Sequence, residues 1–211
     1  MQAAASGTGD QRVAGVAAIV LAAGRSSRMG AQNKLLADIG GMPMVRRVVE
    51  TALASRARPV LVVTGHQRTE VAAALPGLDV ALIANPDYAT GLASSLKAGI
   101  RSIPAGCAGA LILLADMPRL GAEHIDRLVE AFGAAPDTIV VPVHEGRQGN
   151  PVLWPRYYFP ELLQLEGDAG AKRLIVANPE RVREIEMSSA AIFADVDTPE
   201  ALARMRDDTD P

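Results

Sequence analysis

Short apolar runs alternate along the chain with longer segments whose apolar positions recur every three or four residues. The short runs are typical of buried β-strands and the longer segments of amphipathic helices. The expected strands are 16–21, 59–64, 80–84, 110–114 and 138–143, with shorter strand-like segments at 151–155 and 182–187. The expected helices are 43–55, 69–75, 92–103, 123–132, 158–165 and 169–177, and a final helix capped by Thr198 that runs through Met205.

This alternation of strand and helix predicts βαβ units. Such units build a mostly parallel, Rossmann-like doubly wound sheet with helices on both faces, which is a three-layer α/β/α fold. A chain of 211 residues suits one domain of this kind. We expect that domain to span residues 15–207, between a flexible N-terminal tail, 1–14, and a C-terminal tail, 208–211.

Composition narrows the functional classes. Hydrophobic residues make up 49% of the chain and aromatic residues 3%, so the core must be built from Ala, Val, Leu and Ile, as in buried parallel sheets. A net charge of −3 argues against a general nucleic-acid binder. No apolar run reaches the roughly 18 residues of a membrane span, and the N-terminus lacks the pattern of a signal peptide, so we expect a cytoplasmic protein. The single cysteine, Cys107, has no disulfide partner, and we expect it to be buried.

The first candidate site is the loop that follows the first strand. Ligands of open α/β sheets bind at the carboxyl ends of strands, and small residues there let backbone N–H groups approach phosphate oxygens. Arg25, Arg28 and Lys34 add cations that offset the charge of a triphosphate. The residues of this expected nucleotide loop are Leu21, Ala22, Ala23, Gly24, Arg25, Ser26, Arg28, Gly30 and Lys34.

Two other phosphate loops are excluded by counting. A Walker A loop has four residues between its glycines, followed at once by Lys, whereas five residues separate Gly24 from Gly30 and Lys34 comes later. A dinucleotide fingerprint requires glycine two residues after the first one, and that position is Ser26. An NAD-dependent oxidoreductase is therefore a distant alternative.

Two aspartates are candidate metal ligands. Asp116 follows the most apolar strand, and Pro118 then prevents the strand from continuing. Asp197 directly precedes Thr198, which is itself a helix-capping residue. Carboxylates from distant segments can hold Mg²⁺ against substrate phosphates. A turn-forming Asp116 and a purely capping role for the 195–200 segment stay open as alternatives.

Two Gly-rich turns form a further group, 149–151 and 167–172. Their polar side chains suit contact with an acceptor, although turn chemistry explains them nearly as well. We interpret His66, His124 and His144 as incidental surface or loop residues. The aromatic residues Trp154, Tyr157 and Tyr158 are expected to pack together rather than to stack on a base.

Taken together, these segments resemble the MobA-like nucleotidyltransferases, and most closely their molybdenum cofactor (molybdopterin) cytidylyltransferase branch. The resemblance covers about residues 16–205. The Ala22-Ala23-Gly24 sequence is similar to the cytidylyl branch, whereas the guanylyl branch tends to carry Ala-Gly-Gly. Two departures are Ala201, where an acid is frequent, and Lys172, where Arg is common. The resemblance implies the nucleotide-diphospho-sugar transferase type of α/β/α fold.

The resemblance also assigns residues to roles. It implies that Arg28, Lys34 and Asp116 are catalytic, and that Asp116 and Asp197 bind Mg²⁺, with Mn²⁺ as a substitute. The nucleotide site is completed by Gly65, Asn85, Gly91, Ser94 and Ser95. The acceptor is expected to contact Asn150, Gly167, Asp168, Gly170 and Lys172.

The implied reaction joins CTP and molybdopterin, with or without molybdenum, to give the cytosine dinucleotide and pyrophosphate. The acceptor's phosphate monoester attacks the α-phosphorus, and because its second pKa is about 6, no general base is needed. A molybdoenzyme or its chaperone is the expected transient partner. The alternatives are another phosphorylated acceptor such as a sugar phosphate, a guanylyl or adenylyl donor, and a noncatalytic chaperone that holds the pterin.

Overall fold

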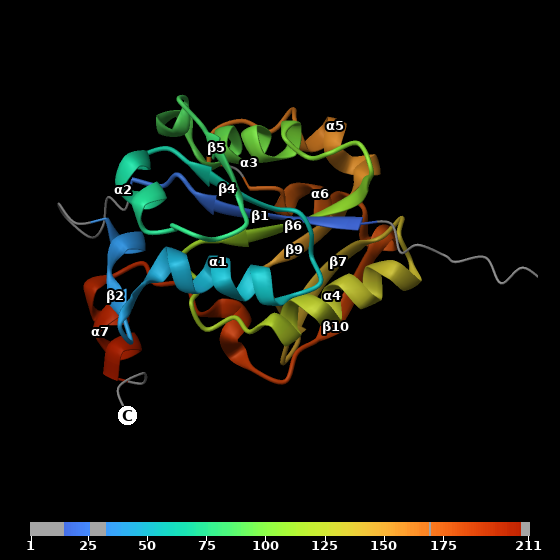
Figure 1. The fold of residues 1–211 in the computed structure, drawn as a ribbon. Helices are drawn as coiled ribbons and strands as arrows, with labels where there is room; N and C mark the ends of the chain where they lie inside the picture. The colour runs from blue at the N-terminus through green and yellow to red at the C-terminus, as the bar shows by residue number, and fades with distance from the viewer. Residues whose placement is uncertain (1–14, 26–32, 169, 208–211) are drawn as a thin grey trace, which may run out of the picture.

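The computed structural model describes residues 15–25, 33–168 and 170–207. One sheet of eight strands runs through these residues, in the order β10-β7-β9-β6-β1-β4-β5, with β8 paired to β7 (Figure 1). The strands are β1 (Gly15–Ala22), β4 (Val60–Thr64), β5 (Ala81–Ala84), β6 (Cys107–Leu114), β7 (Ile139–His144), β8 (Arg147–Gln148), β9 (Val152–Pro155) and β10 (Val182–Glu186). The expected mostly parallel α/β/α fold is confirmed.

Strand β1 lies in the middle of this sheet and is buried on both faces. Side chains alternate along a strand, so Ala18, Val20 and Ala22 pack into one apolar cluster. Ile19 and Leu21 pack into the other. Both faces need a cover, and this requirement explains why the run from 16 to 21 is apolar without alternation.

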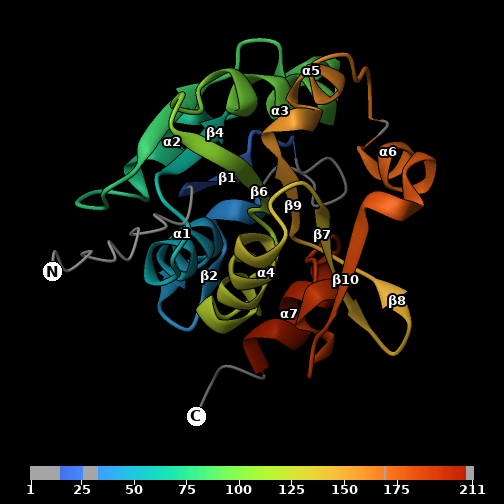
Figure 2. The same ribbon diagram turned by 90° about the vertical axis from the view of Figure 1, so that its right-hand side faces the viewer.

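Helices supply that cover on both sides of the sheet (Figure 2). The first cluster holds α1 (Met44–Ala54), α2 (Arg68–Ala73) and α4 (Ala122–Ala134). The second holds α3 (Leu92–Arg101), α5 (Phe159–Leu162) and α6 (Lys172–Ala177). No helix in the described part of the chain is long and apolar enough to cross a membrane.

One strand runs against the parallel direction. Strand β9 pairs antiparallel with β6, with Val152 opposite Ile112 and Pro155 opposite Gly109. Because β9 is reversed, it begins at the edge where the parallel strands end. The turn at 149–151, which precedes β9, therefore lies at the same edge of the sheet as the loop after β1.

The N-terminal third contains a hairpin that the apolar pattern did not predict. Strands β2 (Asp38–Ile39) and β3 (Met42–Pro43) pair around Gly40 and Gly41, which have φ angles of 60° and 84°. Pro43 therefore ends a strand, and α1 begins at Met44 instead of at Pro43. The helices expected at 158–165 and 169–177 are shorter than predicted, since α5 has four residues and α6 has six.

The C-terminal segment returns to the carboxyl edge of the sheet. Helix α7 (Pro199–Asp207) packs through Leu202 and Met205 onto Ile39 and Met44, at the hairpin and the start of α1. Thr198 caps α7 as expected, because its Oγ1 accepts a hydrogen bond from the backbone N–H of Ala201 at 3.2 Å.

Candidate active site

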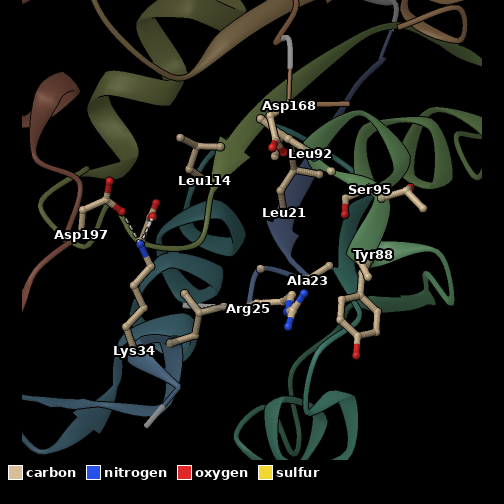
Figure 3. Close-up of a pocket in the computed structure, with 16 residues that line it drawn as sticks. Leu21, Ala23, Arg25, Lys34, Tyr88, Leu92, Ser95, Leu114, Asp168 and Asp197 are labelled. Atoms are coloured by element: carbon tan, nitrogen blue, oxygen red, sulfur yellow. Dashed lines mark hydrogen bonds and ion pairs between the residues drawn. The ribbon is translucent and has the colours of Figure 1, made fainter. Parts of the chain in front are cut away.

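A cleft of about 500 Å³ lies at the carboxyl edge of the sheet (Figure 3). It is bounded by the end of β1, the 3₁₀ turn Lys34–Leu36, the segment between β5 and α3, the end of β6 and the C-terminal segment. Its lining residues are Leu21, Ala23, Gly24, Arg25, Lys34, Leu35, Tyr88, Ala89, Thr90, Gly91, Leu92, Ser95, Leu114, Asp116, Asp168 and Asp197. The cleft thus lies where open α/β sheets bind their ligands.

Three charged side chains meet at one end of the cleft. Lys34 Nζ donates a hydrogen bond to Asp116 Oδ2 at 2.6 Å and another to Asp197 Oδ1 at 2.7 Å. The side chains of Lys34, Asp116 and Asp197 are 12%, 17% and 42% exposed. We call these three residues the charged triad.

Each member of the triad is held by a different part of the fold. Lys34 begins a 3₁₀ turn whose N-cap is Asn33, and Asn33 Oδ1 accepts from the backbone N–H of Leu35 at 3.1 Å. Asp116 follows β6, which is buried beside β1. The backbone N–H of Val196 donates to the carbonyl oxygen of Asp116 at 2.9 Å, so Asp197 is placed beside it.

Burial and charge act in opposite directions on this triad. Burial alone would lower the pKa of Lys34, but Asp116 and Asp197 outweigh it, and the pKa is raised above its usual value. Burial also raises the pKa of Asp116, an effect that Lys34 opposes and Asp197 reinforces. The lysine is therefore held as a cation between the two carboxyl groups.

The two carboxylates have the chemistry of a small divalent-cation site. Asp116 Oδ1 is buried and has no hydrogen-bond partner among the described residues. Within the same residues, no cluster of three or more His, Cys, Asp or Glu could hold a metal. Mg²⁺ in nucleotide sites is commonly held by one or two carboxylates, with substrate phosphates and water completing its shell. The residues present fit that pattern.

Glycines shape the cleft in two ways. A Cβ on Gly24 would meet no atom of the described residues within 4 Å, and Gly24 lines the cleft. A Cβ on Gly65 would lie 2.5 Å from Tyr88 Cβ and 2.8 Å from Ala23 Cβ. Gly65 therefore acts by packing beneath the cleft and does not line it.

Gly91 both lines the cleft and packs closely against a neighbouring segment. Its φ is 116°, and a Cβ there would lie 2.5 Å from the Gly167 carbonyl carbon. The 167–168 segment also caps α3. Asp168 Oδ1 accepts from Leu92 N–H at 3.1 Å, and Gly167 O accepts from Ala93 N–H at 3.0 Å. These two N–H groups are consequently not directed at a phosphate.

A second cavity of about 340 Å³ adjoins the first and shares Leu21, Leu92 and Leu114 with it. Its wall is apolar on one side and carries polar residues near the 149–151 and 170–172 turns. The remaining lining residues are Ala93, Leu96, Ile112, Gln148, Gly149, Asn150, Val152, Trp154, Gly170, Ala171, Lys172 and Ile175.

The structure separates the expected site residues into groups. The residues expected to bind nucleotide that line the first cleft are Leu21, Ala23, Gly24, Arg25, Lys34, Gly91 and Ser95. Those that lie behind its wall are Ala22, Gly65, Asn85 and Ser94. Ser26, Arg28 and Gly30 lie outside the described residues.

Both metal candidates, Asp116 and Asp197, line the first cleft. Of the expected acceptor residues, Asn150, Gly170 and Lys172 line the second cavity. Asp168 lines the first cleft instead, and Gly167 packs against Gly91.

Several lining residues carried no signal in the sequence. Tyr88 and Thr90 line the first cleft because the chain turns there between β5 and α3. Gln148 reaches the second cavity from β8, a strand of only two residues. The Gly-Gly pair at 40–41 could have predicted the β2-β3 hairpin, since two residues with positive φ are typical of a tight hairpin.

Histidines and aromatic residues differ partly from expectation. Among the described residues that line the two cavities there is no histidine. His124 is buried, not at the surface, and its Nδ1 accepts a hydrogen bond from Gly121 N–H at the start of α4. The three aromatic residues pack together as expected: the ring centroids of Trp154 and Tyr158 lie 5.9 Å apart and those of Tyr157 and Tyr158 lie 5.3 Å apart, both edge to face, although Tyr157 is 76% exposed. Cys107 is buried as expected.

The fold and the cleft define a protein of the nucleotidyltransferase class: a mostly parallel sheet whose carboxyl edge carries a small-residue loop, a lysine and two converging aspartates. Residues 18–182 match the MobA-like NTP transferase domain, and the chain belongs to that family.

Related proteins cover nearly the whole chain. It is 33% identical to the purine catabolism protein PucB of Bacillus subtilis, over 89% of this chain and 94% of that protein. It is 28% identical to the molybdenum cofactor cytidylyltransferase of Escherichia coli, over 86% of this chain and 91% of the relative. The crystal structure of Rv0371c from Mycobacterium tuberculosis superposes with a TM-score of 0.80, at 25% identity over 92% of this chain and 97% of the other.

Proposed function

We propose that this protein is a Mg²⁺-dependent nucleotidyltransferase that transfers CMP from CTP to the terminal phosphate of molybdopterin. The observation that carries the proposal is the adjoining pair of cavities, with the charged triad at one end of the first. A nucleotide in the first cavity and a phosphorylated acceptor in the second would meet near the shared wall of Leu21, Leu92 and Leu114.

The chain's own residues provide positioning and charge neutralisation, which are the main sources of catalysis in phosphoryl-type transfer. In the nucleotide complex Lys34 turns from the carboxylates to the triphosphate and stabilises the charge that develops on pyrophosphate. Arg25 lies exposed on the same cleft and adds positive charge there. Arg28 lies outside the described residues, and its role as a third cation stays a prediction from the sequence and the family resemblance.

Asp116 and Asp197 are the residues that hold the metal in this proposal. Their carboxylate oxygens already converge on one cation, the Lys34 ammonium, at 2.6 and 2.7 Å. When bound, Mg²⁺ would neutralise phosphate oxygens of the substrate. Mn²⁺ is the expected substitute, because it accepts the same oxygen ligands.

The second cavity suits a partly apolar acceptor with an anionic end. Trp154, Ile112 and Ile175 give it an apolar floor, and Lys172 offers a cation to a phosphate. No residue near either cavity is required as a general base, because a phosphate monoester is already ionised near pH 7.

A second candidate is the same transfer to a different acceptor. The similarity to PucB, a protein named for purine catabolism, is higher than the similarity to the molybdenum cofactor cytidylyltransferase. The nucleotide loop favours CTP through its resemblance to the cytidylyl branch, and the acceptor is the less constrained substrate.

The experiment that tests the proposal measures pyrophosphate release with each of CTP, GTP, ATP and UTP. Each nucleotide is supplied with Mg²⁺, with and without molybdopterin, and products are identified by mass spectrometry. We expect release only with CTP and molybdopterin together. If pyrophosphate is released with another acceptor, such as a sugar phosphate, molybdopterin is the wrong acceptor in this proposal. If the protein binds the pterin but releases no pyrophosphate, it is a chaperone and not an enzyme.

A further inference from the structure

A buried amide connects the end of β5 to the start of α3. Asn85 is 5% exposed, and its Nδ2 donates to Ser94 Oγ at 2.9 Å and to Ser95 Oγ at 3.0 Å. Its Oδ1 accepts from the backbone N–H of Asp87 at 3.0 Å. Since a backbone N–H can only donate, the amide oxygen must face Asp87, and the amide NH₂ group must face the serines.

This orientation determines what each serine hydroxyl can do. Both hydroxyl oxygens accept from Asn85, so each has one proton left to donate. Ser94 Oγ donates its proton to the carbonyl oxygen of Gly91 at 2.9 Å. Ser95 Oγ donates to no acceptor among the described residues, and Ser95 lines the first cleft. The Ser95 proton is therefore available to a ligand.

The position of Ser95 in the cleft indicates which part of a nucleotide it meets. Figure 3 shows Lys34 and Asp197 at one end of the cleft and Ser95 and Tyr88 at the other. A triphosphate held by Lys34, and by a Mg²⁺ ion on the two aspartates, would place the nucleoside toward Ser95. This step rests on the proposed function.

We propose that Asn85 is a positioning residue that keeps Ser95 as a hydrogen-bond donor to an acceptor atom of the bound nucleoside. Asn85 itself lies behind the cleft wall and does not touch the nucleotide. Its effect is to fix the polarity of the Ser95 hydroxyl, which does touch it. The acceptor atom belongs either to the base, as a carbonyl oxygen or ring nitrogen, or to a ribose hydroxyl.

Asn85→Asp is the variant that tests polarity with little change in shape. A carboxylate accepts from Ser94 and Ser95 instead of donating to them, so the Ser95 proton turns away from the cleft. The backbone N–H of Asp87 remains satisfied, and accepting several hydrogen bonds keeps a buried carboxylate ionised. Ser95→Ala removes the hydroxyl itself.

The measurement is CTP binding to the full chain by calorimetry in the presence of Mg²⁺. We expect both Asn85→Asp and Ser95→Ala to weaken CTP binding about tenfold, the effect of losing one buried hydrogen bond. The double variant should bind as weakly as either single variant and no weaker, because the two changes remove the same interaction. Ser102→Ala, at the end of α3 where Oγ donates to Ala98 O at 2.9 Å, is the matched control and should bind CTP normally.

Two further ligands complete the test. Mg²⁺-pyrophosphate has no nucleoside, so its affinity should be equal in all variants. With 2′-deoxy-CTP, the loss caused by Ser95→Ala disappears if the acceptor is the 2′-hydroxyl and persists if it is another atom, such as one of the base. Equal CTP binding by the wild type, Asn85→Asp and Ser95→Ala would overturn the inference, as would additive losses in the double variant. A wild type that binds no nucleotide would instead overturn the proposed function.

Discussion

Lys34 is the residue on which the proposed chemistry depends most directly. The sequence marked it as a phosphate-binding cation, and the structure shows that it also links two acidic residues that lie 82 and 163 positions away. No local pattern could have predicted that contact, because it depends on how β6 and the C-terminal segment are brought together. Asp116 and Asp197 could be selected as candidates from their neighbours, but their pairing with Lys34 could not.

Lys34→Ala should reduce turnover by about 10²–10³-fold, the usual effect of removing a group that stabilises transition-state charge. The fold should survive with a loss of about 1–2 kcal/mol in the free energy of unfolding. The loss is small because the triad is partly exposed, so water partly screens the repulsion between the two remaining carboxylates. Pyrophosphate release and thermal melting measure the two effects. Lys97→Ala is the control, because this lysine on α3 lines neither cavity. It should change neither the turnover nor the melting temperature.

Asp116→Asn tests the second member of the triad without changing its size. An amide oxygen still accepts from Lys34, so the melting temperature should change little, but the negative charge for Mg²⁺ is lost. We expect turnover to fall by at least about 10²-fold. A rate close to the wild type at saturating Mg²⁺ would remove Asp116 from the metal site.

Cys107 provides a check on burial that is independent of function. Burial raises the pKa of the Cys107 thiol, although Arg156 partly opposes this effect, and the thiolate is the reactive form. We therefore expect a thiol reagent such as DTNB to react slowly with the native protein and rapidly in guanidinium chloride. Fast stoichiometric labelling of the native protein would show that the start of β6 is more open than the structure indicates.

At the level of elements, the apolar runs predicted the central strands well. Strands such as β1 and β4 are buried on both faces, so burial alone makes their residues apolar. The same reasoning fails where strands are short or reversed. Strands β2 and β3 have two residues each, which is too few for a periodic pattern. The sequence of residues 151–155 does not indicate that β9 runs antiparallel to β6.

The loops after β1 and β4 contain two glycines with opposite expected behaviour. Gly24→Ala adds a methyl group to the cleft where no described residue has an atom within 4 Å, so thermal stability should be unchanged while nucleotide binding weakens about tenfold. Gly65→Ala forces a Cβ against Tyr88 and Ala23, and overpacking of this kind costs about 1–3 kcal/mol. Melting curves and CTP titrations of the two variants separate the two roles, and a destabilised Gly24→Ala would contradict the open position assigned to Gly24.

At the level of the whole molecule, the site is assembled by three distant segments. The turn at 34–36, the end of β6 and the segment before α7 meet because α7 packs on the hairpin and the start of α1. The sequence could predict that these segments carry function, since each follows a strand or precedes a helix. It could not predict that Lys34 would occupy the space between the two carboxylates.

That arrangement makes the lysine and a divalent cation competitors for the same oxygen atoms. Lys34 Nζ lies 2.6 Å from Asp116 Oδ2 and 2.7 Å from Asp197 Oδ1, so a metal ion can use these two oxygen atoms only after Lys34 moves. A triphosphate provides the alternative partner for Lys34. We therefore expect Mn²⁺, followed by electron paramagnetic resonance, to bind weakly to the protein alone and at least about tenfold more tightly with CTP.

Lys34→Met should reverse this dependence, because the side chain keeps most of its length and loses its charge. Mn²⁺ should then bind more tightly than in the wild type when no nucleotide is present, and CTP should bind less tightly. The double variant Lys34→Met, Asp116→Asn should lose the gain in Mn²⁺ affinity, since one of the two carboxylates is gone. Equal Mn²⁺ binding by the wild type and Lys34→Met without nucleotide would show that Lys34 does not occupy the metal position, and the lysine would then have to contact phosphate and carboxylates at the same time.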